Sequence, residues 1–213
     1  NDVFIVSPGF KNDTYWDPKV WSGKALIEAL AEIKKKYKIC DTKLLYYGYS
    51  AGSQCSNLFP AWKPEITRAW VSHACGVFHE PSQKMRGVPG LVTCGDVDMQ
   101  RYMISRKFVE DSRKKDVNII WKSFPNHPHD VPPESQKLAR AFLSYYHNLY
   151  SDDLKGAGGA RVANEKPVFI GDDVEQVYYS AKAPAVKEIP KEERVYLPSE
   201  EIAEAWGKPG KRE

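Results

Sequence analysis

Short, continuous apolar runs that alternate with segments of helical periodicity are the strongest constraint on how this chain can fold. The runs lie at 3–6, 44–47, 69–72, 90–93 and 117–121. Each has the length of one strand and lacks the apolar–polar alternation of a half-exposed strand, as is typical of strands buried on both faces. Strands of this kind with helices between them predict an α/β fold with a doubly wound, mostly parallel sheet.

Two long helices are expected, one after the first apolar run and one after the last. Asp17 precedes a proline, which is typical of an N-cap followed by the first helical turn, and apolar residues then recur at helical spacing to about Tyr37. Pro132 and Pro133 open the strongest helix, whose apolar stripe extends to Leu149. This second helix should cover one face of the sheet.

The composition changes beyond Ser151, where glycine, proline, lysine and glutamate dominate and a glycine-rich stretch at 156–159 predicts a flexible break. We therefore expect residues 1–150 to form the core and residues 151–213 to form an appended segment. The segment is expected to contain a hairpin around 169–179 and a helix over 200–206 capped by Ser199.

Charge and composition exclude several classes of protein. The 31 basic and 28 acidic residues give a net charge of +3 without a long run of one sign, so no nucleic-acid groove is predicted. No apolar stretch approaches the roughly 18 residues that span a bilayer, so no membrane span is predicted.

The four cysteines, Cys40, Cys55, Cys75 and Cys94, show neither CxxC spacing nor a histidine at metal-ligand distance, so no metal site is expected. Buried thiols are the favoured interpretation. A disulfide stays open, as does a reactive pair of Cys75 and Cys94 near the ends of two runs.

The segment Gly48-Tyr49-Ser50-Ala51-Gly52 fits the GxSxG pattern of a nucleophile elbow. It lies where an apolar strand ends and a helix begins, so its glycines permit the tight turn that exposes Ser50 at the carboxyl edge of the sheet. The alternative is a tight strand-to-helix turn around an ordinary serine.

A nucleophilic serine needs a base within hydrogen-bond reach and a carboxylate that orients the base. Asp96 and Asp98 follow the fourth apolar run, and His127 and His129 follow the fifth. All four positions are at predicted carboxyl ends of strands, and the order serine, aspartate, histidine is that of the α/β-hydrolase fold. The residues alone leave open which aspartate and which histidine take part.

The stretch from Val3 to Leu149 resembles the α/β-hydrolase superfamily, and more narrowly the lidless esterases and predicted peptidases grouped with polyhydroxybutyrate depolymerases, feruloyl esterases and dienelactone hydrolases. In these families the acid belongs to a GxxD turn, which falls on Asp98. Their histidine directly precedes an acidic residue and the last core helix, which matches His129. The resemblance therefore implies a catalytic triad of Ser50, Asp98 and His129.

The backbone N–H of Ala51 is the expected first donor to an oxyanion at the nucleophile. One helix separates the run at 3–6 from the nucleophile strand, so the strands and the oxyanion loop that precede these elements in the family have no counterpart here. We expect an upstream segment or a second chain to complete the oxyanion hole.

The short spacing between the triad members leaves no room for a lid domain, so an open site is expected. Phe10, Trp16 and Tyr49 could form an aromatic wall for a small-molecule or polymer ester, although aromatic residues in such loops equally often pack the core. The predicted function is a serine esterase that needs no cofactor. The alternatives are a serine peptidase of the same fold and a catalytically inactive binding or scaffold protein.

Overall fold

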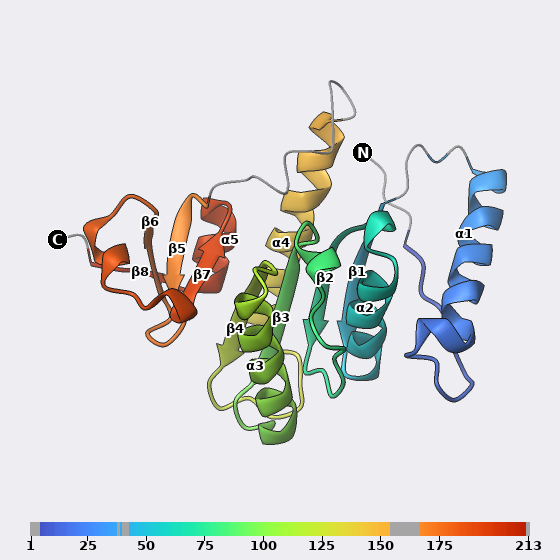
Figure 1. Cartoon of the computed structure of the whole chain (residues 1–213), viewed down its shortest axis with the longest axis horizontal. Helices are drawn as coiled ribbons and strands as arrows, with labels where there is room; N and C mark the ends of the chain where they lie inside the picture. Colours follow the sequence, from blue (N-terminus) through green and yellow to red (C-terminus); the bar gives the residue numbers. More distant parts are fainter. Residues whose placement is uncertain (1–4, 38, 40–42, 154–166, 212–213) are drawn as a thin grey trace.

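The computed structural model describes residues 5–37, 39, 43–153 and 167–211 (Figure 1). Four of the predicted runs form one parallel sheet, whose spatial order is β1-β2-β3-β4. Its strands are β1 (Leu44–Tyr49), β2 (Thr67–His73), β3 (Gly90–Gly95) and β4 (Ile119–Phe124). Since the strands are parallel, their carboxyl ends and the loops that follow them lie at one edge of the sheet.

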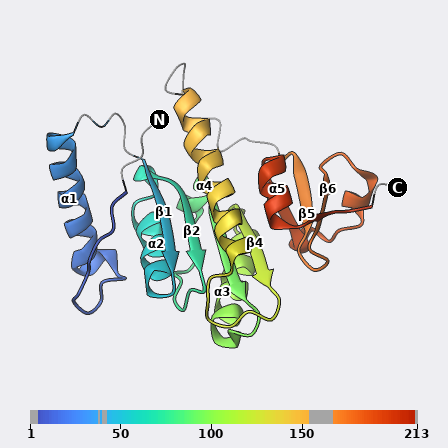
Figure 2. The ribbon, with the colours of Figure 1, turned by 180° about the vertical axis from the view of Figure 1, so that it is seen from behind.

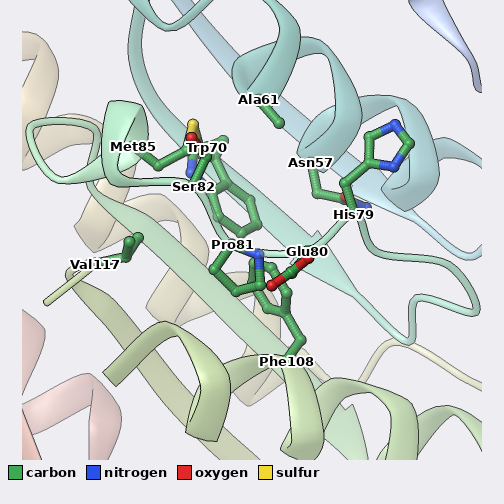
Figure 3. Close-up of a pocket in the computed structure, with 10 residues that line it drawn as sticks. All are labelled: Asn57, Ala61, Trp70, His79, Glu80, Pro81, Ser82, Met85, Phe108 and Val117. Atoms are coloured by element: carbon green, nitrogen blue, oxygen red, sulfur yellow. The ribbon is translucent and has the colours of Figure 1, made fainter. Parts of the chain in front are cut away.

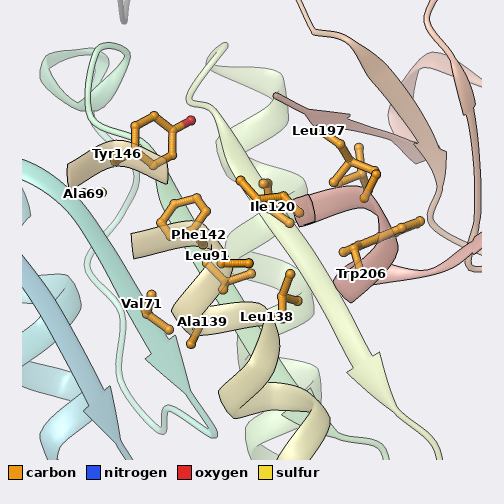
Figure 4. Packing of buried hydrophobic residues seen from close by; sticks show 14 of the residues in the cluster. Ala69, Val71, Leu91, Ile120, Leu138, Ala139, Phe142, Tyr146, Leu197 and Trp206 are labelled. Atoms are coloured by element: carbon orange, nitrogen blue, oxygen red, sulfur yellow. The ribbon is translucent and has the colours of Figure 1, made fainter. Parts of the chain in front are cut away.

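Helices cover both faces of this sheet. α2 (Ala51–Trp62) and α3 (Met99–Lys114) lie on one face, and α4 (Pro133–Asp153) crosses the other (Figures 1 and 2). Alternate strand residues enter two separate apolar clusters, and Figure 4 shows the one that packs under α4. Burial on both faces explains why the runs are continuously apolar. The result is an α/β fold with a parallel sheet flanked by helices, compatible with double winding.

The first helix begins where the Asp17-Pro18 pair predicts. The Asp17 carboxylate accepts a hydrogen bond from the Lys19 N–H at 2.9 Å. A π-helical turn, Pro18–Ser22, then continues as α1 (Gly23–Lys36). A β-carbon at Gly23 would lie 2.6 Å from the Trp62 ring, so the glycine allows the start of the helix to pack against α2.

The strand expected at 3–6 is absent from the described part of that run. Ile5 and Val6 are in no strand, and Ile5 is 90% exposed; positions 3 and 4 lie outside the described residues. A β-strand needs a neighbouring strand for its backbone groups. In the described ranges, β1 is an edge strand with β2 as its partner, so Ile5 and Val6 do not pair with its outer edge and remain without a neighbouring strand.

The appended segment forms a second sheet with the order β7-β5-β6-β8. β5 (Phe169–Asp172) and β6 (Val177–Ser180) make the predicted hairpin, joined by β7 (Arg194–Leu197) and β8 (Lys208–Pro209). α5 (Glu200–Trp206) is the predicted last helix, and the Ser199 hydroxyl accepts from the Ile202 N–H as its cap. The glycine-rich stretch at 156–159 lies outside the described residues.

Short 3₁₀ turns complete the described chain, at Pro64–Ile66, Gln83–Met85, Pro184–Lys187 and Lys191–Glu193.

None of the helices in the described ranges is long and apolar enough to cross a bilayer.

The second sheet packs on the β4 side of the core through buried contacts. The Trp206 indole N–H donates to the Trp121 carbonyl at 2.6 Å, and Trp206 is fully buried. The nearly buried Asp173 carboxylate pairs with Arg106 at 2.6 Å and with Arg113 at 2.7 Å, both from α3. Trp206 and Leu197 also enter the apolar cluster under α4 (Figure 4). The appended segment therefore shares its apolar core with the first sheet.

Candidate active site

Ser50 stands between β1 and α2 in a strained backbone conformation. Its φ is 51° and its ψ is −116°, a left-handed region that costs a non-glycine residue on the order of 1–3 kcal/mol. A β-carbon at Gly48 would lie 2.1 Å from the Gly52 carbonyl oxygen, so only glycine lets the helix start this close to the strand. The Ser50 N–H donates to the His73 carbonyl of β2 at 3.0 Å, which holds the turn in place. Strain of this kind is more typical of a functional site than of an ordinary turn.

The three residues implied as a triad lie in one hydrogen-bonded chain. His129 Nε2 lies 2.8 Å from Ser50 Oγ, and His129 Nδ1 lies 2.6 Å from Asp98 Oδ2. A carboxylate can only accept, so Nδ1 carries the proton, and Nε2 of the neutral ring accepts from the serine hydroxyl. Ser50 thus has a base in reach, and the base has an orienting carboxylate.

The two residues left open by the sequence have other partners. Asp96 accepts a hydrogen bond from the Asn126 N–H at 2.7 Å, and His127 Nδ1 lies 3.2 Å from the Asp130 carboxylate. Both contacts hold two loops in shape, the acid loop at 96–98, between β3 and α3, and the histidine loop at 125–132, between β4 and α4. Of the two aspartates and the two histidines, the pair aligned with Ser50 is Asp98 and His129.

Tyr49 supports the histidine loop. Its hydroxyl donates to the His129 carbonyl at 2.8 Å, and its ring stacks on the imidazole with centroids 5.1 Å apart. Tyr49 therefore positions His129, a role that its place beside the nucleophile in sequence does not reveal.

The other predicted aromatic residues pack mainly against the protein. Phe10 contacts Trp21 edge to face at 5.2 Å and stacks on Phe59 of α2 at 6.4 Å. Trp16 is half-buried and contacts Tyr15 at 5.2 Å. Phe10 thus anchors the chain before α1 to α2, while Trp16 keeps part of its surface exposed.

Arg101 is a member of the site that sequence reasoning missed. Its Nη1 lies 3.2 Å from Asp98 Oδ1, the carboxylate oxygen that does not face His129. The Asp98 side chain is only 6% exposed, and a buried carboxylate requires such partners. The spacing of three residues on the first turn of α3 was the available signal.

His73 is a second residue whose contribution was missed, although a structural role was expected for it. It is fully buried at the end of β2, and its Nε2 lies 2.7 Å from the Asp130 carbonyl, so Nε2 must donate. Nδ1 then accepts from the hydroxyls beside it, those of Thr93 on β3 at 2.5 Å and of Ser135 on α4 at 2.9 Å. His73 in its neutral form therefore ties the histidine loop to the sheet and to α4.

Protonation of His73 at acidic pH should destabilise the folded protein. Burial lowers the pKa of His73 from its ordinary value of 6.5, so the unfolded chain takes up this proton at a higher pH than the folded chain does. The free energy of unfolding should therefore fall as the pH drops below 6.5. Urea unfolding from about pH 8 to about pH 5 measures it.

His73→Gln is the matched variant, because its amide keeps one donor and one acceptor but does not titrate. The loss of stability in acid should be smaller in His73→Gln than in the wild type. An identical pH dependence in the two proteins would assign the effect to other groups.

The described thiols are poor candidates for a nucleophile. Burial is the main cause that raises the pKa of Cys94 to about 12 and that of Cys55 to about 11. Burial also raises the pKa of Cys75, whose sulfur lies 3.1 Å from Asn57 Nδ2. All three are free thiols; Cys40 lies outside the described residues. Thiols of this kind remain protonated at neutral pH and act as core residues.

A small pocket between α2, α3 and the loop after β2 is separate from this site. Figure 3 shows Asn57, Trp70 and Phe108 among its lining residues, and none of the triad residues line it. Its cavity of about 10 Å³ has room for roughly one water molecule. The described residues also contain no group of three histidines, cysteines or carboxylates arranged to hold a metal ion.

Comparison with known proteins supports the fold. No protein-family model and no curated protein match this sequence. Among solved structures, one similar chain is an uncharacterized protein from Bacillus cereus ATCC 10987, known from a crystal structure at 2.75 Å. It is 18% identical with a TM-score of 0.52, and the match covers 63% of this chain and 45% of that chain. The chain thus spans less than half the length of that protein, and the likeness shows an α/β fold alone.

Proposed function

We propose that this protein is a serine hydrolase of the α/β-hydrolase fold that cleaves carboxylic esters through an acyl-enzyme. The observation that carries the proposal is the hydrogen-bonded chain from the strained Ser50 through His129 to Asp98, with 2.8 Å and 2.6 Å between the paired atoms. A base at this distance can take the serine proton as the nucleophile attacks. The position of all three residues at the carboxyl ends of parallel strands supports the fold assignment.

The proposed reaction has two half-reactions. Ser50 Oγ attacks the ester carbonyl carbon while His129 Nε2 takes the hydroxyl proton, and Asp98 stabilises the imidazolium that forms. The tetrahedral intermediate expels the alcohol, which receives the proton from His129. A water molecule then attacks the acyl group, again with His129 as base, and releases the acid and free Ser50.

The oxyanion of each tetrahedral intermediate needs hydrogen-bond donors. Ala51 is the first residue of α2, so no preceding helical turn offers its N–H a carbonyl, and this N–H is our first donor. We propose that the second comes from an upstream segment or a second chain on the outer side of β1. In the described part of the chain no strand pairs with that edge, and a parallel strand there would end beside Ser50.

The same triad can hydrolyse amides, so a serine peptidase is the nearest alternative. The unpaired edge of β1 favours a different class, an inactive scaffold that keeps the elbow without a complete oxyanion hole. The two classes differ in whether Ser50 is an activated nucleophile.

Labelling by a fluorophosphonate probe tests the proposal. The probe reacts only where a nucleophile, its base and the oxyanion donors act together. We expect one labelled peptide, containing Ser50, and no labelling of Ser50→Ala or of the heat-denatured protein. Resistance of the folded protein to the probe would mean that this chain by itself lacks working machinery. That result would favour the scaffold, or a site that the proposed upstream segment or second chain must complete.

A further inference from the structure

Two side-chain hydrogen-bond donors lie near the loop that separates the proposed nucleophile from the proposed acid. The sheet order places β2 between β1, which leads into Ser50, and β3, which precedes Asp98 (Figure 1). The loop after β2 therefore lies between the two loops that carry these residues. It contains Gly76, which is partly exposed.

Two donors lie equally near one point beside Gly76. A β-carbon at this glycine would have Arg101 Nε and Gln54 Nε2 as its nearest heavy atoms, both at 3.9 Å. Arg101 reaches this point from α3 and Gln54 from α2. Gln54 lies about one helical turn beyond Ser50, or roughly 6 Å along the axis of α2. The point therefore lies at the same edge of the sheet as the proposed nucleophile.

The donor atoms are available for a ligand. Arg101 uses Nη1 for Asp98, and its side chain is 34% exposed. Among the hydrogen bonds of the described residues, neither Arg101 Nε nor Gln54 Nε2 has an acceptor. The bond to Asp98 fixes the guanidinium plane and leaves its Nε edge free. That edge, with the adjacent Nη2, has the geometry that binds a carboxylate through two parallel hydrogen bonds.

We propose that Arg101 and Gln54 form a subsite for a carboxylate carried by the substrate. The inference rests on the proposed esterase function and narrows its substrate class to esters that bear an anionic group close to the scissile bond. Asp98 offsets part of the arginine charge, so recognition depends on the paired hydrogen bonds more than on net charge. The carboxylate belongs to the acyl part or to the alcohol part of the ester.

The experiment compares anionic esters with neutral esters of the same length. For the acyl side, monomethyl esters of dicarboxylic acids are paired with methyl alkanoates. For the alcohol side, acetyl esters of hydroxy acids are paired with acetyl esters of simple alcohols. We expect one of the two anionic series to have a kcat/KM at least about tenfold higher than its neutral partner, the range expected of charge-assisted hydrogen bonds.

Gly76→Ala is the decisive variant. Its nearest neighbours would stand 3.9 Å from the new methyl group, which is ordinary contact, and the backbone is not left-handed there, so the variant should fold. The methyl group occupies the point that lies 3.9 Å from both donors. The preference for the anionic ester should fall about tenfold. Gly87→Ala is the control, because a β-carbon there meets nothing within 4 Å, and it should keep the preference.

The outcomes separate this inference from the function on which it rests. If the wild type hydrolyses both ester series equally, or if Gly76→Ala keeps the full preference, the subsite is wrong while the esterase stands. If neither series is hydrolysed, both proposals are wrong. Arg101→Lys adds a second test, since it keeps the charge but loses the paired hydrogen bonds and should also lower the preference.

Discussion

Asp98→Asn should lower kcat for a hydrolysed ester by about ten-thousandfold, the size of effect seen when the orienting carboxylate of a serine hydrolase becomes an amide. If the new amide nitrogen at position 98 donates to His129 Nδ1, the ring proton of His129 must lie on Nε2. A protonated Nε2 cannot take the proton of the Ser50 hydroxyl. Rates per active site, titrated with the fluorophosphonate probe, would measure the change.

Asp96→Asn is the matched control for this prediction. Asp96 accepts from the Asn126 N–H, and an asparagine oxygen can accept the same hydrogen bond. Asp96→Asn should therefore keep kcat within about tenfold of the wild type. The opposite ranking of the two variants would make Asp96 the orienting acid and would refute the proposed role of Asp98.

The largest stability effect is expected for Trp206→Ala, which should lower the free energy of unfolding by about 3–5 kcal/mol. The indole is fully buried, donates to the Trp121 carbonyl and lies against Gly171, where a β-carbon would approach the ring to 2.6 Å. Removing it leaves a large cavity and an unpaired carbonyl. Urea unfolding followed by circular dichroism would measure the loss.

Tyr196→Ala provides the comparison within the same sheet. The Tyr196 side chain is 47% exposed, so its truncation should cost less than about 1 kcal/mol. Because Trp206 belongs to the cluster that packs under α4, we expect Trp206→Ala to shift one transition for the whole protein. A separate early transition would show instead that the second sheet unfolds independently of the first.

Much of the fold could be predicted because it depends on local patterns. The apolar runs in β1 to β4 and the Asp17 and Ser199 caps act over a few residues, and their elements appear where expected. The run at 3–6 has the same local pattern, yet Ile5 and Val6 form no strand. A strand depends on its neighbour in space, and no local pattern reports whether one is present.

In the candidate site, too, local features could be predicted and tertiary contacts could not. The elbow at Ser50 could be predicted because its glycines and its place between strand and helix are local features. Arg101 and Tyr49 could not be assigned their roles, because they act on Asp98 and His129 through contacts that only the folded chain brings about.

By itself, the sequence determined the parallel α/β core and the place of the turn at Ser50, because strand burial and turn geometry follow from the order of neighbouring residues. It also limited the candidate acid and the candidate base to two aspartates and two histidines. Only the tertiary structure decided which of these side chains come together with Ser50. The close approach of the acid and histidine loops, where a β-carbon at Gly95 would lie 2.1 Å from the His127 carbonyl oxygen, aligns Asp98 with His129 and uses Asp96 to hold the backbone. A hydrogen bond across 31 residues depends on where the two strands place their ends, and that distance is set by the packed sheet.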